Sequence, residues 1–280
     1  NPPPILEAAK VIDKIKTADV LISNFKKGDD VKLNITDTAL RKVNPKLIIA
    51  KITGFGLESD RVAYDLILQA ESGFMSINGE KNAGPLKMPV ALIDVLAAHQ
   101  LKEAILLALL HRHTEGEAKT VHVSLYDAAV CSLTNQASNY LMTKNSPERL
   151  GNLHPNIAPY GEIFKTKDDK QITFAIGSNR HFVDLCSSLQ LDIIEEQDFA
   201  TNQLRVQNRE KLETLIQQKV KHVDSNQLMN KLHHLNVPCA FIKNIKEVLD
   251  SKMSQDLIRS ESIDGEPTSR ITSIGFKWID

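Results

Sequence analysis

Asp94 is the residue whose type and setting most clearly suggest covalent chemistry in this sequence. It lies between Leu92-Ile93 and Val95–Ala98, in an apolar stretch where an ionisable side chain is unexpected. One interpretation is a carboxylate nucleophile or base held in an apolar pocket. The other is the N-cap of a helix, a position that aspartate favours and that is worth about 1 kcal/mol. Ala97 stands where a capping box would have Glu or Gln, yet the residues alone favour the cap.

Other arrangements of reactive residues predict less. His111 and His113 are two residues apart and lack the spacing and further ligands of a zinc site, so we expect no metal. Gly54 and Gly56 follow an expected strand without the third glycine of a dinucleotide-binding fingerprint. Cys131 falls in the middle of an apolar helix, which is a poor place for a reactive thiolate.

Composition and charge exclude several classes of protein. The 280 residues are 42% hydrophobic and 25% charged, with a formal net charge of −1, as in an ordinary globular protein. We therefore expect no nucleic-acid partner and no membrane partner, although Lys26-Lys27 and Lys51 are candidates for binding a small anion. The three cysteines predict free buried thiols in a reducing compartment, the cytoplasm or a mitochondrial matrix: Cys131, Cys186 and Cys239.

Helical and strand patterns alternate through the first half of the chain. We expect strands over residues 19–25, 46–56 and 120–125. We expect helices over residues 3–18, 35–45, 64–80 with a break at Ser72-Gly73, 94–113 and 126–143. Short apolar strands that alternate with helices predict a parallel α/β sheet.

A stretch rich in Pro, Gly and Asn at residues 144–161 separates a second region with a different pattern. It begins with a hairpin and several short helices, followed by a strand and helix from Val237 and a terminal strand from Ser269. The predicted fold is α/β, with a Rossmann-like parallel-sheet lobe over residues 1–150 and a smaller α+β lobe over 151–255. Residues 256–280 are expected to return toward the first lobe.

Six blocks of sequence, in their order and spacing, resemble the family III CoA-transferases of the CaiB/BaiF type, which include formyl-CoA and succinyl-CoA:dicarboxylate enzymes. The blocks are "ADVLISNF", "NPKLIIAKITGFG", "YDLILQAESGFMSINGE", "MPVALIDVLAAHQ", "VHVSLYDAAV" and "RLGNLHPNIAPYGEIF". The resemblance runs from Ala18 to about Asp250. It implies that Asp94 is the acyl-accepting nucleophile. The family's glycine a few residues downstream is replaced here by Ala98 or His99.

The same resemblance implies which residues bind coenzyme A, the substrate thioester. Asn24 and Phe25 match residues at its nucleotide end, and Lys32 with Leu33 match residues at its adenine and phosphate side. Lys32 has a second interpretation as a solvated lysine in a charged run. Tyr64 matches a residue beside the acyl site, with a packed tyrosine as the alternative.

Further expectations concern the assembly and the second lobe. The segment from Gly151 to Asn156 matches a cover loop, in which His154 is more often a loop-fixing residue than a catalyst. Relatives form interlocked homodimers when full length, and they have further residues before the start of this chain. Because the sequence opens with Asn1-Pro2-Pro3-Pro4 and no initiator Met, we expect a piece of a longer protein, incomplete at the N-terminus of its CoA-binding lobe.

The function implied by the resemblance is transfer of CoA from an acyl-CoA to a small carboxylic acid, through an aspartyl anhydride and an aspartyl-CoA thioester. A 2-methylacyl-CoA racemase on the same scaffold is one alternative, but Tyr64 and Asn179 stand where racemases have a histidine and a glutamate. Neither residue is a good base at neutral pH. An inactive CoA-binding fragment is another alternative, and the sequence does not choose the acid pair.

Overall fold

The computed structural model describes residues 11–279, whose chain divides into two units between Gly151 and Asn152. Residues 11–15 are helical, as the first predicted helix requires, and the earlier part of that helix lies outside the described residues. The predicted return of residues 256–280 toward the first lobe stays a prediction.

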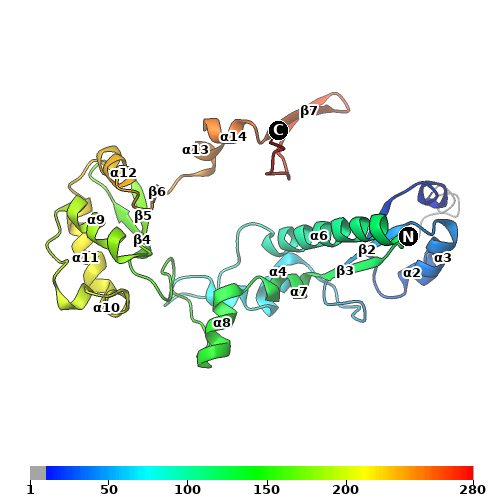
Figure 1. The fold of residues 1–280 in the computed structure, drawn as a ribbon, viewed down its shortest axis with the longest axis horizontal. Helices are drawn as coiled ribbons and strands as arrows, with labels where there is room; N and C mark the ends of the chain where they lie inside the picture. The colour runs from blue at the N-terminus through cyan, green and yellow to red at the C-terminus, as the bar shows by residue number, and fades with distance from the viewer. Residues whose placement is uncertain (1–10, 280) are drawn as a thin grey trace. The chain divides into compact units, whose positions relative to one another are not determined.

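Three short strands form a parallel sheet in the first unit. They are β1 (Val20–Ser23), β2 (Ile48–Thr53) and β3 (Thr120–Ser124), in the order β1-β2-β3. Ile22 pairs with Ala50, and Ile52 pairs with Val123. The start of β2 is fully buried, as expected for a central strand of a parallel sheet. The predicted α/β class and parallel sheet are confirmed (Figure 1).

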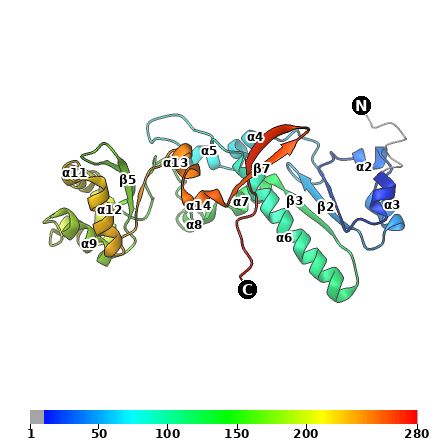
Figure 2. The ribbon, with the colours of Figure 1, turned by 90° about the horizontal axis from the view of Figure 1, so that it is seen from above.

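Seven helices of this unit have defined bounds: α2 (Asp29–Lys32), α3 (Asp37–Val43), α4 (Asp65–Glu71), α5 (Phe74–Ile77), α6 (Leu92–Glu115), α7 (Leu125–Cys131) and α8 (Thr134–Thr143). The predicted break at Ser72-Gly73 is present between α4 and α5, where Gly73 has a φ of 92°. The long helix α6 contacts β2 and β3 (Figure 2). It begins at Leu92, two residues before the predicted start.

A small apolar cluster fixes the start of α6. Leu68 of α4, Ile93 of α6 and Ala129 of α7 are buried together, and Phe55 and Phe74 pack against them. Because Ile93 is anchored in this cluster, the next residue, Asp94, is carried on a packed turn of helix.

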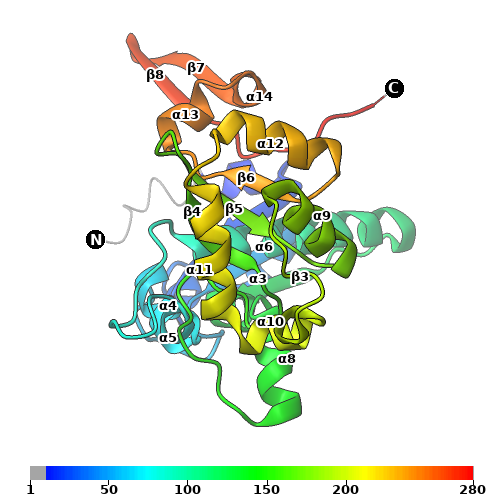
Figure 3. The same ribbon diagram turned by 90° about the vertical axis from the view of Figure 1, so that its left-hand side faces the viewer.

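The second unit contains an antiparallel sheet with helices packed on it (Figure 3). Its strands are β4 (Tyr160–Lys165), β5 (Gln171–Ala175) and β6 (Cys239–Phe241), in that order. Its helices are α9 (Asn179–Leu189), the 3-10 helix η1 (Gln197–Phe199), α10 (Asn202–Gln207), α11 (Arg209–Val220) and α12 (Ser225–His234). Phe164 and Phe174 of the sheet, with Leu185 and Ile216 of the helices, belong to one buried core. The predicted hairpin is confirmed.

Three local predictions are wrong. The single helix expected over 126–143 is divided into α7 and α8 around Ser132-Leu133. The expected terminal strand is the second arm of a hairpin, β7 (Ile258–Ile263) with β8 (Glu266–Ile271), which follows α13 (Ile245–Leu249) and α14 (Lys252–Gln255). Cys131 is exposed, whereas the three thiols were expected to be buried.

Gly161 in β4 is a position where only glycine fits. Its φ is 100°, and a Cβ atom there would lie 1.9 Å from the carbonyl oxygen of Asn152. Gly177 has no such φ and no atom within 4 Å of an added Cβ.

We therefore expect Gly161→Ala to lower the free energy of unfolding by about 2 kcal/mol or more, because a left-handed residue with a Cβ alone costs about 1–2 kcal/mol. Gly177→Ala is the control and should change the free energy of unfolding by less than about 1 kcal/mol. Urea unfolding of both variants measures the difference. Equal stabilities would contradict the close approach of residue 152 to β4.

Candidate active site

A cavity of about 740 Å³ lies at the carboxyl ends of the parallel strands in the first unit. Its lining includes Ser23 and Asn24 at the end of β1, Thr53 and Gly54 at the end of β2, and Leu125 just after β3. The carboxyl edge of a parallel sheet is the usual place for a ligand in open α/β folds, and this volume is within the range of ligand pockets.

The loop after β2 closes against the cavity because Gly54 has no side chain. A Cβ on Gly54 would lie 2.1 Å from the Cβ of Ala63, so the loop can fold back on itself only at glycine. Arg61 lies over the ring of Phe55, at 4.0 Å, and donates a hydrogen bond of 3.0 Å to Glu71 at the end of α4. These contacts hold Arg61 beside the cavity, which it also lines.

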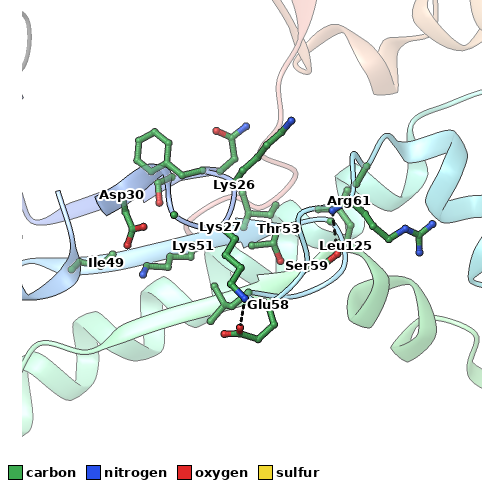
Figure 4. A pocket seen from close by; sticks show the side chains of 18 of the residues that line it. Lys26, Lys27, Asp30, Ile49, Lys51, Thr53, Glu58, Ser59, Arg61 and Leu125 are labelled. Atoms are coloured by element: carbon green, nitrogen blue, oxygen red, sulfur yellow. Dashed lines mark hydrogen bonds and ion pairs between the residues drawn. The ribbon is translucent and has the colours of Figure 1, made fainter. Parts of the chain in front are cut away.

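Basic side chains from separate segments line the same cavity (Figure 4). Lys27 extends to Glu58, at 2.8 Å, and Lys51 on β2 pairs with Asp37 at 2.6 Å. Lys26 has no ion-pair partner within residues 11–279. The arrangement suits an anionic ligand such as a phosphate, as expected for Lys26-Lys27 and Lys51.

Asp94 also lines the cavity, but its environment differs from both interpretations made from the sequence. It is the third residue of α6, and the N-cap position belongs to Ala91, so the N-cap interpretation is wrong. Its side chain is exposed, so the expected enclosure in an apolar pocket is wrong as well. Among the described residues, no hydrogen bond or ion pair holds its carboxylate. Asp94 therefore presents an unpartnered carboxylate to the cavity.

The surroundings of Asp94 also disfavour the charged form of its carboxyl group. Partial burial, and then the nearby carboxylate of Asp65, raise the pKa of Asp94 above its ordinary value of 3.8. A carboxylate that is neither hydrogen-bonded nor paired is a better nucleophile than a stabilised one.

The start of α6 is capped from another helix. Asp65, the first residue of α4, accepts the backbone N–H groups of Ile93, at 2.7 Å, and of Asp94, at 3.3 Å. Sequence reasoning missed Asp65 and also Gln69, which is buried on the same helix. The signal in the sequence was Gln69, four residues after Asp65 in the otherwise apolar run "DLILQA", since residues at this spacing share one face of a helix.

The structure brings together four of the six residues expected to form the site. Asn24, Phe25, Tyr64 and Asp94 line the cavity. Tyr64 precedes α4 and is 71% exposed, so it is not the packed tyrosine of the alternative interpretation.

The remaining two expected residues, Lys32 and Leu33, are not part of the cavity lining. Lys32 ends α2 and pairs with Asp29 at 3.0 Å, with an exposed side chain. This setting is close to the solvated lysine of the alternative interpretation. The binding roles of these two residues and of the four lining residues stay predictions.

His154 in the second unit has the contacts of a loop-fixing residue. Its Nδ1 atom accepts the N–H of Asn156 at 3.1 Å, and its ring packs on that of Tyr160 at 4.8 Å. Burial, and then the charge of Arg209, lower the pKa of its imidazole. The side chain of Arg209 in turn donates to the carbonyl of His154 at 2.7 Å.

Asn179 is held by a buried cation. Its Oδ1 atom accepts a hydrogen bond of 2.8 Å from Arg205, which is 1% exposed and also donates to the carbonyl of Phe199. The amide at position 179 thus has a structural partner at the start of α9, and it provides no group with a useful pKa for proton abstraction.

Within the described part of the chain, no cluster of three or more His, Cys, Asp or Glu side chains could hold a metal ion. In the same residues, no helix combines the length and the apolar character needed to cross a bilayer.

Comparison with known proteins relates the whole chain to one family. The model of CoA-transferase family III matches residues 8–277. A succinate–glutarate CoA-transferase of Agrobacterium fabrum is 37% identical over 238 residues, which are 84% of this chain and 59% of that protein. A succinyl-CoA:mesaconate CoA-transferase of Haloarcula marismortui is 31% identical over 250 residues, which are 86% of this chain and 62% of that protein. The chain thus spans about three fifths of the length of these relatives.

The crystal structure of a CaiB/BaiF family protein from Brucella suis has the same fold. It superposes with a TM-score of 0.78 at 32% identity, and the superposition covers 98% of this chain and 72% of that one. The predicted resemblance is confirmed.

The raised pKa of Asp94 has a consequence for stability. A carboxyl group whose pKa is higher in the folded chain binds its proton more tightly there, so stability falls as the pH rises through the window above 3.8. We therefore expect Asp94→Asn to raise the free energy of unfolding at pH 7, because an amide carries no charge. Urea unfolding should show this gain at pH 7 and none below pH 3.8. A variant less stable than the parent at pH 7 would contradict it.

Proposed function

We propose, because the chain belongs to CoA-transferase family III, that this protein transfers CoA from an acyl-CoA to a carboxylic acid with Asp94 as the nucleophile. The observation that carries the proposal is the unpartnered carboxylate of Asp94 on a cavity with basic side chains. Both requirements of the reaction meet there, a nucleophile and a place for a phosphate-bearing thioester.

The first half of the proposed reaction frees the donor acid. A carboxylate oxygen of Asp94 attacks the thioester carbonyl, the carbon–sulfur bond breaks, and CoA leaves as a thiolate. The product on the protein is a mixed anhydride of Asp94 and the donor acyl group. The thiolate then attacks the Asp94 carbonyl of this anhydride, which gives an aspartyl-CoA thioester and releases the donor as a carboxylate.

The second half repeats these steps with the acceptor. Its carboxylate attacks the aspartyl thioester, CoA thiolate leaves, and the thiolate then attacks the acceptor's carbonyl in the new anhydride. Acyl-CoA of the acceptor is formed and the carboxylate of Asp94 is regenerated. The electron pairs balance without ATP, since one thioester is lost and one is formed.

The other residues of the cavity have supporting roles in this proposal. Asn24 and Phe25 contact the nucleotide end of CoA, and Lys32 with Leu33, at the end of α2 and outside the cavity lining, extend that contact. The basic residues Lys26-Lys27 and Lys51 face its phosphates. Tyr64, which is exposed and lines the same cavity as Asp94, donates a hydrogen bond to the carbonyl oxygen of the thioester as negative charge develops on it.

We propose short dicarboxylic acids as the acids exchanged, because the relatives described above are named for succinate, glutarate and mesaconate. The full-length protein is proposed to act as an interlocked homodimer. A panel of carboxylates assayed for CoA exchange identifies the pair, since one mismatched group in such a pocket changes the preference by only about 1–3 kcal/mol.

Trapping of the aspartyl intermediate tests the nucleophile. Full-length protein incubated with succinyl-CoA and hydroxylamine should acquire a hydroxamate on the peptide that contains Asp94. Succinate in place of its CoA thioester is the control and should give no hydroxamate. Asp94→Ala should abolish both the modification and CoA transfer, and a variant that keeps full transferase activity would refute the proposal.

The role of the basic side chains is tested by Lys51→Met. We expect the KM for the acyl-CoA donor to rise about tenfold, because one charge-assisted hydrogen bond contributes roughly 1.5–3 kcal/mol and Asp37 offsets part of it. The value of kcat should change little, since Lys51 is proposed to contact only phosphate. Lys119→Met is the matched control, because Lys119 pairs with Glu117 and is not part of the cavity lining. Equal KM values in the two variants would exclude a phosphate contact by Lys51.

A further inference from the structure

Two polar side chains on one face of α4 bond the backbone that leads to Asp94. Asp65 and Gln69 are four residues apart, so both face the same neighbour. Asp65 Oδ2 accepts the N–H groups of Ile93 and Asp94, at 2.7 Å and 3.3 Å. Gln69 Nε2 donates to Asp65 Oδ1, which orients the carboxylate. The first turn of α6 is thus capped by a side chain of α4 and not by the side chain of its own N-cap residue.

Gln69 extends this contact to the segment before α6. Its Oε1 atom accepts the N–H of Met88 at 2.7 Å, and its Nε2 atom also lies 3.4 Å from the carbonyl oxygen of Val90. The side chain is 1% exposed, so its bonds are shielded from water. A buried glutamine with its donor and acceptor both in use specifies one position for the chain around it.

Because Asp65 caps α6, it determines whether the carboxylate of Asp94 has a backbone N–H group to bond. An aspartate in the first turn of a helix ordinarily stabilises the free N–H groups there with its own carboxylate. In α6 the N–H groups of residues 93 and 94 already donate to Asp65. The carboxylate of Asp94 is therefore left on the cavity side without a hydrogen bond from any described residue.

The charge of Asp65 adds a second effect. Two carboxylates at one helix start repel each other, and the repulsion ends when one of them becomes a neutral anhydride or thioester. The titratable groups on the elements that pack on α6 are Lys51 on β2, His122 on β3, Asp65 and Glu71 on α4, and Tyr126, Asp127 and Cys131 on α7. Of these, Asp65 is the one whose charge acts on the Asp94 carboxyl group.

We infer that Asp65, oriented by Gln69, is a positioning residue for Asp94: it occupies the N–H groups at the start of α6 and destabilises the free carboxylate relative to its acylated form. The inference rests on the proposed function, in which Asp94 becomes acylated. Asp65 itself forms no bond to the substrate and is not a catalytic residue in this scheme.

The test is Asp65→Asn in the full-length protein, which keeps the shape of the side chain and an acceptor oxygen but removes the charge. We expect the single-turnover rate of Asp94 acylation, followed as CoA release, to fall about tenfold, which is 1.4 kcal/mol. The KM for the donor should stay unchanged. The acid limb of the acylation rate should move to lower pH, because loss of the Asp65 charge lowers the pKa of Asp94.

Asp65→Ala removes the acceptor as well as the charge. It should slow acylation further and increase hydrogen exchange at the amides of Ile93 and Asp94, a measurement that needs no activity. Thr36→Ala is the structural control, since it removes the N-cap of α3 in the same unit without touching α6. It should leave both the rate and the acid limb unchanged.

The outcomes separate this inference from the proposed function. Loss of activity in Asp94→Ala, together with a parental rate and acid limb in Asp65→Asn, would overturn the positioning role alone. Retention of activity in Asp94→Ala would overturn the proposed function, and unchanged amide exchange in Asp65→Ala would overturn the cap.

Discussion

The hydrogen bonds from the first turn of α6 to the carboxylate of Asp65 are the constraint on which the candidate site depends. Helix N–H groups at an N-terminus need an acceptor, and two aspartates compete for them at this point. The N–H groups donate to Asp65, which lies on a packed helix and is oriented by Gln69. Asp94 lies in the first turn of α6, but no described residue bonds its carboxylate, although an aspartate at such a position normally stabilises the helix. Such local destabilisation is common where a group must react.

Basic side chains line the same cavity as Asp94. Lys27 and Lys51 are paired with Glu58 and Asp37, so the cavity carries little net field before a ligand arrives. The Lys27–Glu58 pair is exposed, and an exposed ion pair contributes only about 0–1 kcal/mol, so exchanging Glu58 for a phosphate costs little.

Patterns local in the chain were predictable, and contacts between distant segments were not. The strands, the break at Ser72-Gly73 and the hairpin from Tyr160 follow from periodicity and from glycine or turn residues. The cap of α6 comes from a residue 28 positions away, so the composition around Asp94 pointed to the wrong cap. The four-residue helix α2 and the polar hairpin β7–β8 were missed because neither has an apolar period to detect. The resemblance to relatives pointed to Asp94, but not to the exposure of its side chain.

Whether the side chains suit CoA transfer or racemisation also depends on which of them are free of structural hydrogen bonds. Racemisation needs two groups able to exchange a proton with the substrate carbon, one on each face. Position 64 offers an exposed phenol, which is a hydrogen-bond donor and a poor base. Position 179 offers an amide whose oxygen is bonded to the buried guanidinium of Arg205. The proposed transfer needs one unpartnered carboxylate and a cavity for the ligand. In the first unit Asp94 lines such a cavity with its carboxylate unpartnered, because the N–H groups at the start of α6 donate to Asp65 instead.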